Sequence, residues 1–230
     1  MSGPVLGLIV LAGYLLGAIP FALLAGKLLQ GIDLREHGSG NLGATNALRI
    51  LGKPAGITVL LLDAAKGGVP VALAPQLLPS APGWLPVALA GAAILGHVFP
   101  VYLRFKGGKG VATSAGAFLA LYPAAFGCAV GVFFLTLALS RIVSLSSLLA
   151  ALALPAAAIA LDGWTAASGA QAPRTGLLVA IAALVWWRHR ANLARLWART
   201  EPRLGHKQSS AGDVESGAEV APVEPPSETS

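Results

Sequence analysis

PVLGLIVLAGYLLGAIPFALLAG, residues 4–26, contains no charged residue and is long enough to cross a lipid bilayer as a helix. A hydrocarbon core about 30 Å thick requires roughly 20 predominantly apolar residues. Further apolar runs follow, of which 111–122 is short for a full span: 55–78, 84–101, 111–122, 124–140, 145–161 and 174–187. The sequence therefore predicts an all-α, polytopic membrane helix bundle with about seven transmembrane helices. Whether 105–122 is a short helix or a re-entrant segment stays open.

The composition favours a membrane bundle over a soluble core. Of the 230 residues, 55% are hydrophobic and 11% are charged, whereas soluble domains have about 25% charged residues. The net charge of +6 does not indicate a nucleic-acid partner, because the Lys and Arg residues form no stripe with interleaved aromatics. Cys128 lies inside an apolar run and offers no disulfide or metal ligand set. We expect no nucleic acid, no metal and no cofactor.

The cations predict an orientation in the membrane. With the N-terminus outside, the inside segments hold the Lys and Arg residues of 27–53, 104–109, 141 and 188–207, and the outside loops hold only Arg174. Cytoplasmic loops carry an excess of Lys and Arg. We therefore expect an odd number of spans in the inner membrane, with the N-terminus outside and the C-terminus cytoplasmic.

The chain divides near residue 204. Residues 1–204 are expected to form one integral membrane domain. From about 205 onward Ser, Gly, Pro and Glu dominate and large apolar residues are almost absent. Such a composition cannot bury enough apolar surface to fold, so 205–230 is predicted to be a disordered, acidic cytoplasmic tail.

The first polar segment is rich in small and hydrogen-bonding residues: Gly38-Ser39-Gly40-Asn41-Leu42-Gly43-Ala44-Thr45-Asn46-Ala47-Leu48-Arg49. Backbone N–H groups in Gly-rich turns can hold anions, and a helix starting near Thr45 would add its N-terminal dipole. Arg49 could bind a phosphate through two parallel hydrogen bonds. The alternative is an ordinary solvated loop with a Ser or Asn helix cap.

The second basic segment, GHVFPVYLRFKGGKGVAT at 96–113, combines Lys106 and Lys109 with glycines. It is not a Walker A motif, because no Ser or Thr follows Lys109 and no strand precedes it. Gly107 and Gly108 would nevertheless allow close backbone approach, with Lys as a point charge. The alternative is a topology anchor. His97 is either an interhelical hydrogen-bonding group or a polar group of the site.

Two further segments lie on the predicted cytoplasmic side. In Ser140–Ser144, Arg141 alone could be a snorkelling anchor, while Ser144 either caps the next helix or contacts a phosphate. The segment 188–195 predicts a basic helical continuation in which His189 and Asn192, spaced i, i+3, share a face. Its alternative is an interfacial amphipathic helix.

Asp63 and Lys66 are also spaced i, i+3, but inside an apolar run. Charges within a membrane are rare and usually paired. We interpret them as a structural ion pair near the cytoplasmic side, with a proton relay as the alternative.

The candidate groups supply cations, hydroxyls, amides and glycine backbone. No adjacent carboxylates, Ser-His-Asp spacing, Cys-His pair or metal cluster is evident in the sequence. Such a set suits a substrate that is already activated and strongly anionic, with positioning and electrostatic stabilisation supplying the rate. Rival classes are a transporter for a phosphorylated metabolite, an intramembrane lipid phosphatase and a non-catalytic scaffold. A transporter would predict inverted repeats and a mid-membrane site, and the sequence has no clear repeat.

Taken together, these motifs resemble those of the bacterial acyl-phosphate-dependent glycerol-3-phosphate acyltransferases. The residues that carry the resemblance are Ser39-Gly40-Asn41, Gly43, Thr45-Asn46, Arg49, Gly96-His97, Phe99-Pro100, Phe105 to Thr113, Ser140-Arg141, Ser144, His189, Asn192, Arg195 and Glu201. One departure is Arg199, where the family is expected to favour glycine before Thr200-Glu201. The chain also lacks the His-x4-Asp motif of other acyltransferases, as the family does.

The resemblance implies transfer of a fatty acyl group from acyl phosphate to the 1-hydroxyl of glycerol 3-phosphate. The products would be lysophosphatidic acid and phosphate, in phospholipid biosynthesis. The implied partners are acyl phosphate, glycerol 3-phosphate, membrane lipid and, functionally, the enzyme that forms acyl phosphate.

The resemblance also implies residue roles. The expected catalytic residues are Ser39, Arg49, Lys106, Lys109, Ser144, His189 and Asn192. The expected substrate-binding residues are Asn41, Gly43, Thr45, Asn46, His97, Gly107, Gly108 and Arg141. The proton of the attacking hydroxyl would pass to the donor phosphate, and a competing hypothesis makes His97 or His189 a general base.

Overall fold

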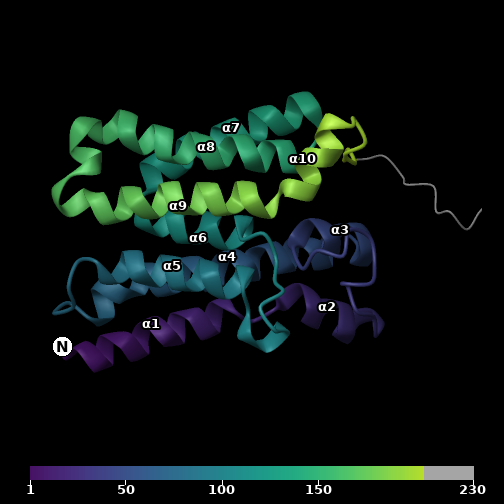
Figure 1. The fold of residues 1–230 in the computed structure, drawn as a ribbon. Coiled ribbons are helices and arrows are strands. Elements are labelled where there is room, and N and C mark those ends of the chain that lie inside the picture. The colour runs from purple at the N-terminus through teal and green to yellow at the C-terminus, as the bar shows by residue number, and fades with distance from the viewer. Residues whose placement is uncertain (205–230) are drawn as a thin grey trace, which may run out of the picture.

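The computed structural model describes residues 1–204, so the predicted tail at 205–230 lies outside the described residues. Helices joined by loops make up the described chain (Figure 1). The α-helices are α1 (Gly3–Gly17), α2 (Phe21–Gln30), α3 (Ala44–Leu51), α4 (Lys53–Leu77), α5 (Leu85–Val98), α6 (Val111–Leu121), α7 (Pro123–Ser140), α8 (Val143–Asp162), α9 (Ala172–Arg188) and α10 (Arg190–Trp197). Short 3₁₀ turns are η1 (Val101–Leu103), η2 (Gly163–Ala167) and η3 (Gly169–Gln171).

The predicted span at 4–26 corresponds to the candidate span Gly3–Gln30, but it is not one continuous helix. α1 ends at Gly17, and α2 begins at Phe21. Pro20 explains the break, because it lacks a backbone N–H and disfavours helical geometry at the preceding residue. The predicted basic helical continuation after Arg188 is likewise interrupted, since α9 ends there and α10 begins at Arg190.

Five helical segments of the described chain are long and apolar enough to span a membrane: Gly3–Gln30, Lys53–Leu77, Leu85–Leu103, Pro123–Ser140 and Val143–Asp162. The other two predicted spans correspond to α6, with 11 residues, and α9, with 17 residues. At about 1.5 Å per residue, α6 rises only about 16 Å. Residues 105–110 therefore form a loop that leads into a short helix.

The helices pack in two groups. α7, α8 and α9 lie on one side, α1, α4 and α5 lie on the other, and α6 lies between them (Figure 1). α4 and α6 approach closely because Gly67 and Gly116 lack side chains. A Cβ on Gly116 would collide with the carbonyl oxygen of Ala64, and one on Gly67 with that of Thr113. Small residues at such contacts are typical of membrane helix packing.

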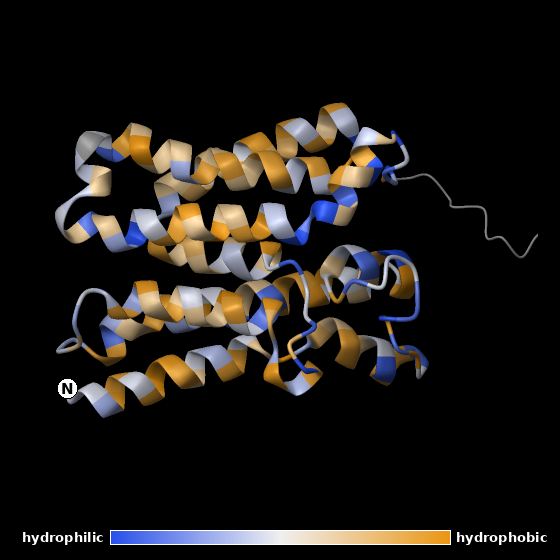
Figure 2. Ribbon diagram, in the orientation of Figure 1, coloured by the Kyte–Doolittle hydropathy of each residue, from blue (hydrophilic) through white to orange (hydrophobic). Residues whose placement is uncertain are grey.

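Large apolar side chains lie both inside and on the surface of the bundle. Phe118 and Ile94 are buried, whereas Leu61, Phe134 and Leu139 are exposed. Figure 2 shows hydrophobic residues along the lengths of the helices and many hydrophilic ones near α2, α3 and α10. A surface that is apolar along the helices is what a lipid environment favours.

α1 and α5 end at about the same level at which α6 begins, short of the ends of α7 and α8 (Figure 1). Gly17 and Gly96 pack backbone to backbone near this level, since a Cβ on either would collide with the other helix. The segments 18–20 and 99–110 therefore lie where these helices stop. This level and the region beyond it, toward α3 and α10, hold the candidate site residues.

Candidate active site

Asn46 fixes the shape of the first polar segment. Its amide donates to the carbonyl oxygens of Leu34 at 3.2 Å and His37 at 3.0 Å, and its Oδ1 accepts the N–H of Ser39 at 2.9 Å. The side chain is buried. The helix predicted to start near Thr45 is confirmed, since α3 begins at Ala44. Asn46 thus organises the loop before α3 through hydrogen bonds to its backbone.

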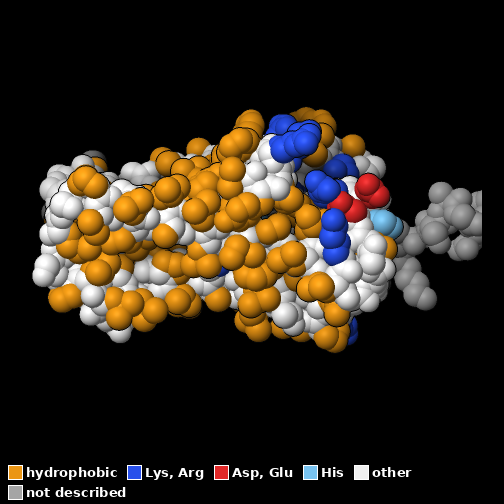
Figure 3. All heavy atoms as spheres, turned by 90° about the horizontal axis from the view of Figure 1, so that it is seen from below, with side chains coloured by type: hydrophobic (Ala, Val, Ile, Leu, Met, Phe, Trp, Pro, Cys, Tyr) orange, Lys and Arg blue, Asp and Glu red, His pale blue; other side chains and the backbone are white. Residues whose placement is uncertain are grey.

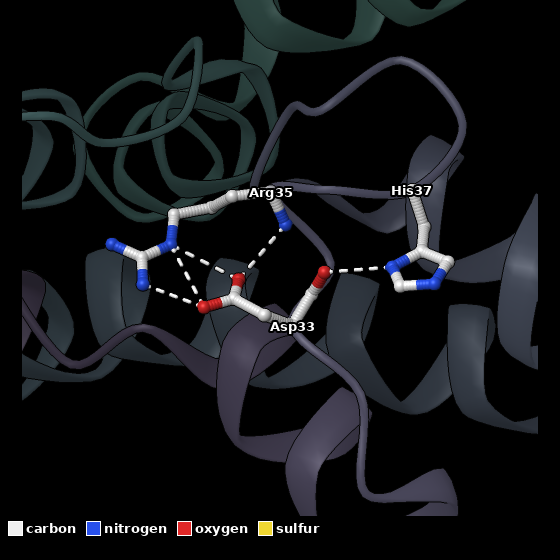
Figure 4. A network of polar contacts seen from close by, with 3 residues as sticks. All are labelled: Asp33, Arg35 and His37. Carbon is white, nitrogen blue, oxygen red and sulfur yellow. Dashed lines mark hydrogen bonds and ion pairs between the residues drawn. The ribbon is translucent and has the colours of Figure 1, made fainter.

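A second set of contacts closes the same loop (Figure 4). The Arg35 guanidinium pairs with the Asp33 carboxylate at 2.6 Å, and the His37 ring contacts the Asp33 carbonyl oxygen at 2.9 Å. Hydrogen bonds from Arg35 lower the pKa of Asp33 to about 2. Asp33 is therefore ionised at neutral pH, and this pair is part of the loop's own structure.

The loop at 105–110, called the glycine loop below, accepts and donates hydrogen bonds on two sides. The N–H groups of Gly107 and Gly108 donate to the carbonyl oxygens of Val98 at 3.2 Å and His97 at 3.1 Å. Arg188 donates to the Gly107 oxygen at 2.7 Å and to the Gly108 oxygen at 3.2 Å. These contacts show that Arg188, which the sequence analysis counted only among the cations that indicate orientation, connects α9 to the glycine loop.

Lys109, at the end of this loop, reaches a network that joins four other residues. Its ammonium donates to Asn192 Oδ1. Glu201 Oε1 accepts from Asn192 at 2.5 Å and from the Ser144 hydroxyl at 2.7 Å, and Glu201 Oε2 accepts from Arg195 at 2.7 Å. Ser144 therefore binds Glu201 and does not cap α8. Predicted residues from the loop before α6, from α8 and from α10 meet around one carboxylate.

The pKa values of this network follow from burial and from its charges. Burial, together with the charges of Arg195, Arg188 and Arg49, lowers the pKa of Lys109 to about 8, although Glu201 opposes this. Burial and the Lys109 charge lower the pKa of His189 to about 4. His189 is therefore neutral at pH 7, and its Nδ1–H donates to the Val185 oxygen at 2.8 Å.

Glu201 stays ionised despite its burial. Burial alone would raise its pKa, but hydrogen bonds from Ser144, Asn192 and Arg195 outweigh that effect and lower it. The network consequently combines the ionised carboxylate of Glu201 with several cations. Among residues 1–204, no group of three His, Cys, Asp or Glu side chains is arranged to hold a metal ion.

Several predicted residues lie on the surface without side-chain hydrogen bonds within the described chain. The exposed ones are Ser39, Thr45, Arg49, Lys106 and Arg141, and Asn41 and Gly43 are half-buried. Arg49 still acts on Lys109 through its charge. The structure thus separates Lys109, which is built into the network, from Lys106, which points to the surface.

The chain after α10 turns back on the bundle. Arg199 adopts a left-handed conformation with φ 57°, which glycine accommodates more easily than other residues. The backbone geometry is consistent with the glycine expected at this position from the family resemblance. The Leu204 N–H donates to the Arg141 carbonyl oxygen at 2.8 Å, so this turn brings Glu201 beside α8.

Three residues with contacts in this site were not among the predicted site residues: Arg195 and Glu201 of the network, and Arg188, which binds the glycine loop. The only sequence signal for Arg195 and Glu201 was the family resemblance. Arg188 carried no signal, since its basic neighbours are equally typical of a topology segment. His97, by contrast, lies directly beneath the glycine loop, where it lines a small cavity with Gly107 and Gly108.

The helices and this network define an integral membrane protein with cationic and amide side chains gathered at one end of its bundle. The chain belongs to the glycerol-3-phosphate acyltransferase family, whose model, described as "Glycerol-3-phosphate acyltransferase", matches residues 7–199. Glu201 lies just beyond this match.

Similar proteins cover nearly the whole described chain. A glycerol-3-phosphate acyltransferase of Myxococcus xanthus (strain DK1622) is 48% identical over 196 residues, covering 85% of this chain and 98% of that protein. One from Synechococcus sp. (strain CC9902) is 45% identical over 204 residues, covering 88% and 97%. The crystal structure of PlsY (YgiH), an integral membrane glycerol 3-phosphate acyltransferase in its glycerol 3-phosphate form, has a TM-score of 0.78 and 36% identity. It covers 87% of this chain and 96% of that chain.

Proposed function

We propose that the protein transfers a fatty acyl group from acyl phosphate to the 1-hydroxyl of glycerol 3-phosphate, in the inner membrane and at its cytoplasmic face. The products are lysophosphatidic acid and inorganic phosphate. One observation carries the proposal: Lys109 is partly buried and feels the positive charges of Arg188, Arg195 and Arg49, and Glu201 is the carboxylate that opposes them. A second crystal structure of PlsY (YgiH), in its lysophosphatidic acid form, is 35% identical and supports the product.

An excess of positive charge is what two phosphate groups require. Glycerol 3-phosphate and acyl phosphate are both anions, and bringing them together at one site is opposed by their mutual repulsion. Cations arranged in advance offset this repulsion without reorganising during the reaction. Acyl phosphate is also activated already, which suits a site without a covalent nucleophile.

The chemical step balances without a cofactor. The 1-oxygen of glycerol 3-phosphate attacks the acyl carbonyl carbon, and the bond from that carbon to the phosphate oxygen breaks. The hydroxyl proton passes to the departing phosphate. His189 supports this route, because a pKa of about 4 makes it a weak base at neutral pH.

We assign residue roles by position. Lys109 and Arg49 bind the phosphates. Ser39 joins them from the loop whose shape Asn46 fixes. Ser144, Asn192 and His189 shape the pocket around Lys109 through the Glu201 network. The acyl chain lies between helices and reaches the lipid.

The proposed orientation has its support in the distribution of charge. Lys and Arg side chains on the face in Figure 3 gather toward one end of the molecule, the end at which the described chain stops. The N-terminus lies at the opposite end (Figure 1). With seven crossings and the N-terminus outside, this cationic end faces the cytoplasm, as the excess of Lys and Arg favours.

The test measures the formation of lysophosphatidic acid by purified protein given glycerol 3-phosphate and one of three donors: acyl phosphate, acyl-CoA or an acyl group carried by acyl carrier protein. Only acyl phosphate also releases inorganic phosphate. We expect turnover with acyl phosphate alone. Arg49→Ala should abolish release while thermal unfolding stays unchanged, and Lys53→Ala, an exposed cation at the start of α4, should not. Turnover with acyl-CoA but not acyl phosphate would overturn the donor assignment.

The proton route has its own test. We expect His97→Gln and His189→Gln to lower the single-turnover rate less than about tenfold, since a positioned general base contributes about a hundredfold or more. A larger loss in either variant, with both substrates still bound, would favour that histidine as the base.

A further inference from the structure

Asp63, Lys66 and His97 form a buried cluster at the level where α1 breaks. The Lys66 ammonium lies 2.7 Å from Asp63 Oδ1 and donates to the Ile19 carbonyl oxygen at 2.7 Å. The exposed fractions are 1% for Asp63, 4% for Lys66 and 7% for His97. The predicted ion pair is therefore confirmed as a contact, and it is joined to a histidine from α5. Burying ionisable side chains within a membrane protein costs free energy, and such side chains are usually paired and often functional.

The two ring nitrogens of His97 face different partners. Nδ1 lies 3.6 Å from Asp63 Oδ1. Nε2 lies against Gly108, because a Cβ on Gly108 would collide with it. The His97 carbonyl oxygen also accepts the Gly108 N–H at 3.1 Å. His97 thus connects Asp63 in α4 to the glycine loop through both its ring and its backbone.

A cavity of about 10 Å³ joins the cluster to this loop. Its lining includes Asp63, Lys66, His97, Gly107 and Gly108. Such a volume holds about one water molecule, and the lining supplies polar partners for it. The distance of 3.6 Å between His97 Nδ1 and Asp63 Oδ1 is slightly too long for a direct hydrogen bond. With this cavity beside it, the pair is suited to a hydrogen bond bridged by one water.

We propose that Asp63 is a positioning residue that fixes the tautomer and orientation of His97 and, through His97, the glycine loop that carries Lys109. Asp63 accepts the Nδ1–H of His97, directly or through one water, so that the unprotonated Nε2 faces Gly108. Lys66 balances the Asp63 charge and ties it to the break after α1. This inference rests on the proposed function, because the loop matters through Lys109 and glycerol 3-phosphate.

The arrangement gives the glycine loop support on both sides. Arg188 holds the Gly107 and Gly108 carbonyl oxygens, and His97 supports the loop from beneath. By fixing the tautomer of His97, Asp63 affects the glycine loop that His97 contacts, and it does not itself contact the substrate. We assign the backbone of Gly107 and Gly108 to glycerol 3-phosphate, so loss of Asp63 should weaken the binding of that substrate and leave donor binding unchanged.

The experiment compares Asp63→Asn with the double variant Asp63→Asn/Lys66→Met, which removes both charges and leaves no unpaired ammonium. Thr175→Val, at a buried hydroxyl near the start of α9, is the matched control. Two quantities are measured on folded protein in lipid nanodiscs: KM for each substrate, and the ¹⁵N shifts of the His97 ring, assigned with His97→Gln.

In the parent we expect the His97 tautomer with a proton on Nδ1. In both Asp63 variants we expect this tautomer to be lost and the KM for glycerol 3-phosphate to rise about tenfold, the scale reported for supporting contacts at sites. In these variants the KM for acyl phosphate should stay within about twofold of the parent value. In Thr175→Val the KM values for both substrates should stay within the same range.

An unchanged tautomer, or an unchanged KM for glycerol 3-phosphate, in the folded double variant overturns the proposal. A merely structural role would lower the amount of active protein without moving either quantity. Failure of the proposed function is distinguishable: a parent without phosphate release overturns that function, while the tautomer measurement needs no substrate and still decides whether Asp63 orients His97.

Discussion

Lys106 and Lys109 are three residues apart, yet only one of them is part of the polar network. Lys106 is exposed, whereas Lys109 is partly buried and donates to Asn192. Burial removes water from the Lys109 ammonium, so that an anion beside it meets a poorly solvated charge. Such a charge interacts more strongly than one in bulk water, and we therefore propose that Lys109 has the main electrostatic role.

Replacing Lys109 tests this assignment. We expect Lys109→Met to reduce kcat/KM about a hundredfold or more, the effect of removing one preorganised charge donor at a reacting centre. Lys106→Met should lose less than about tenfold, because its charge is solvated. The measurement is initial-rate phosphate release, with thermal unfolding as the folding control. Equal losses in the two variants would contradict the assignment.

The lowered pKa of Lys109 predicts a pH dependence. Its folded pKa of about 8 lies below the ordinary 10.5, so the residue loses its charge as pH rises through about 8. The phosphate of the substrate, with a second pKa of about 6, does not titrate there. We therefore expect kcat/KM, which reports the free enzyme, to fall above pH about 8.

The Lys109→Arg variant provides the control for this pH profile. A guanidinium stays charged across the whole range, so its descending limb should move upward by more than one pH unit, even if its rate is lower. A limb that stays in place in Lys109→Arg would show that another group titrates.

The sequence was sufficient to locate the polar segments but not to pair their side chains. Ser39, Arg49 and Lys109 stand out because glycine, Ser and Asn surround a cation locally. Contacts such as Arg188 to Gly107, 81 residues apart, and Ser144 to Glu201, 57 residues apart, depend on how α9 and α8 pack. No local pattern contains that information.

At the scale of elements, the long apolar runs were predicted to within a few residues. The run at 55–78 became Lys53–Leu77, and the one at 145–161 became Val143–Asp162. The break after α1 was missed because hydropathy continues unchanged across Pro20. A single proline alters backbone geometry without altering the apolar character that a bilayer selects.

The packing of the glycine loop predicts that adding one methyl group at Gly108 strongly affects stability and substrate binding. A Cβ on Gly108 would collide with the His97 ring and the Leu42 carbonyl oxygen, whereas one on Gly127 in α7 meets nothing within 4 Å. We expect Gly108→Ala to lower stability by about 1–3 kcal/mol through overpacking and to impair glycerol 3-phosphate binding. Gly127→Ala should be neutral or slightly stabilising. Thermal unfolding and KM measure both effects, and a neutral Gly108→Ala would show that the loop moves freely.

Across the whole molecule, charge and helix length give different kinds of information. The apolar runs indicate how many times the chain can cross, and the cations indicate which end faces the cytoplasm. Because α6 has 11 residues and α9 has 17, length and composition leave five candidate spans in the described chain. In Figure 1 the N-terminus and the end of the described chain lie at opposite ends of the bundle. This supports an odd number of crossings, since an even number would bring both to one side.

Cysteine labelling tests this topology directly. Cys128 is exposed, so it is first replaced by Ser, and single cysteines are then placed at Ser168, between η2 and η3, or at Ala198, after α10. Both positions are exposed. A membrane-impermeant thiol reagent added to intact spheroplasts should label Ser168→Cys and not Ala198→Cys, whereas disrupted membranes should allow labelling of both. The two positions lie at opposite ends of α9, so each result checks the other. Labelling of Ala198→Cys in intact spheroplasts would place the Lys109 network on the outer face, where the positive-inside rule and the proposed cytoplasmic reaction would both fail.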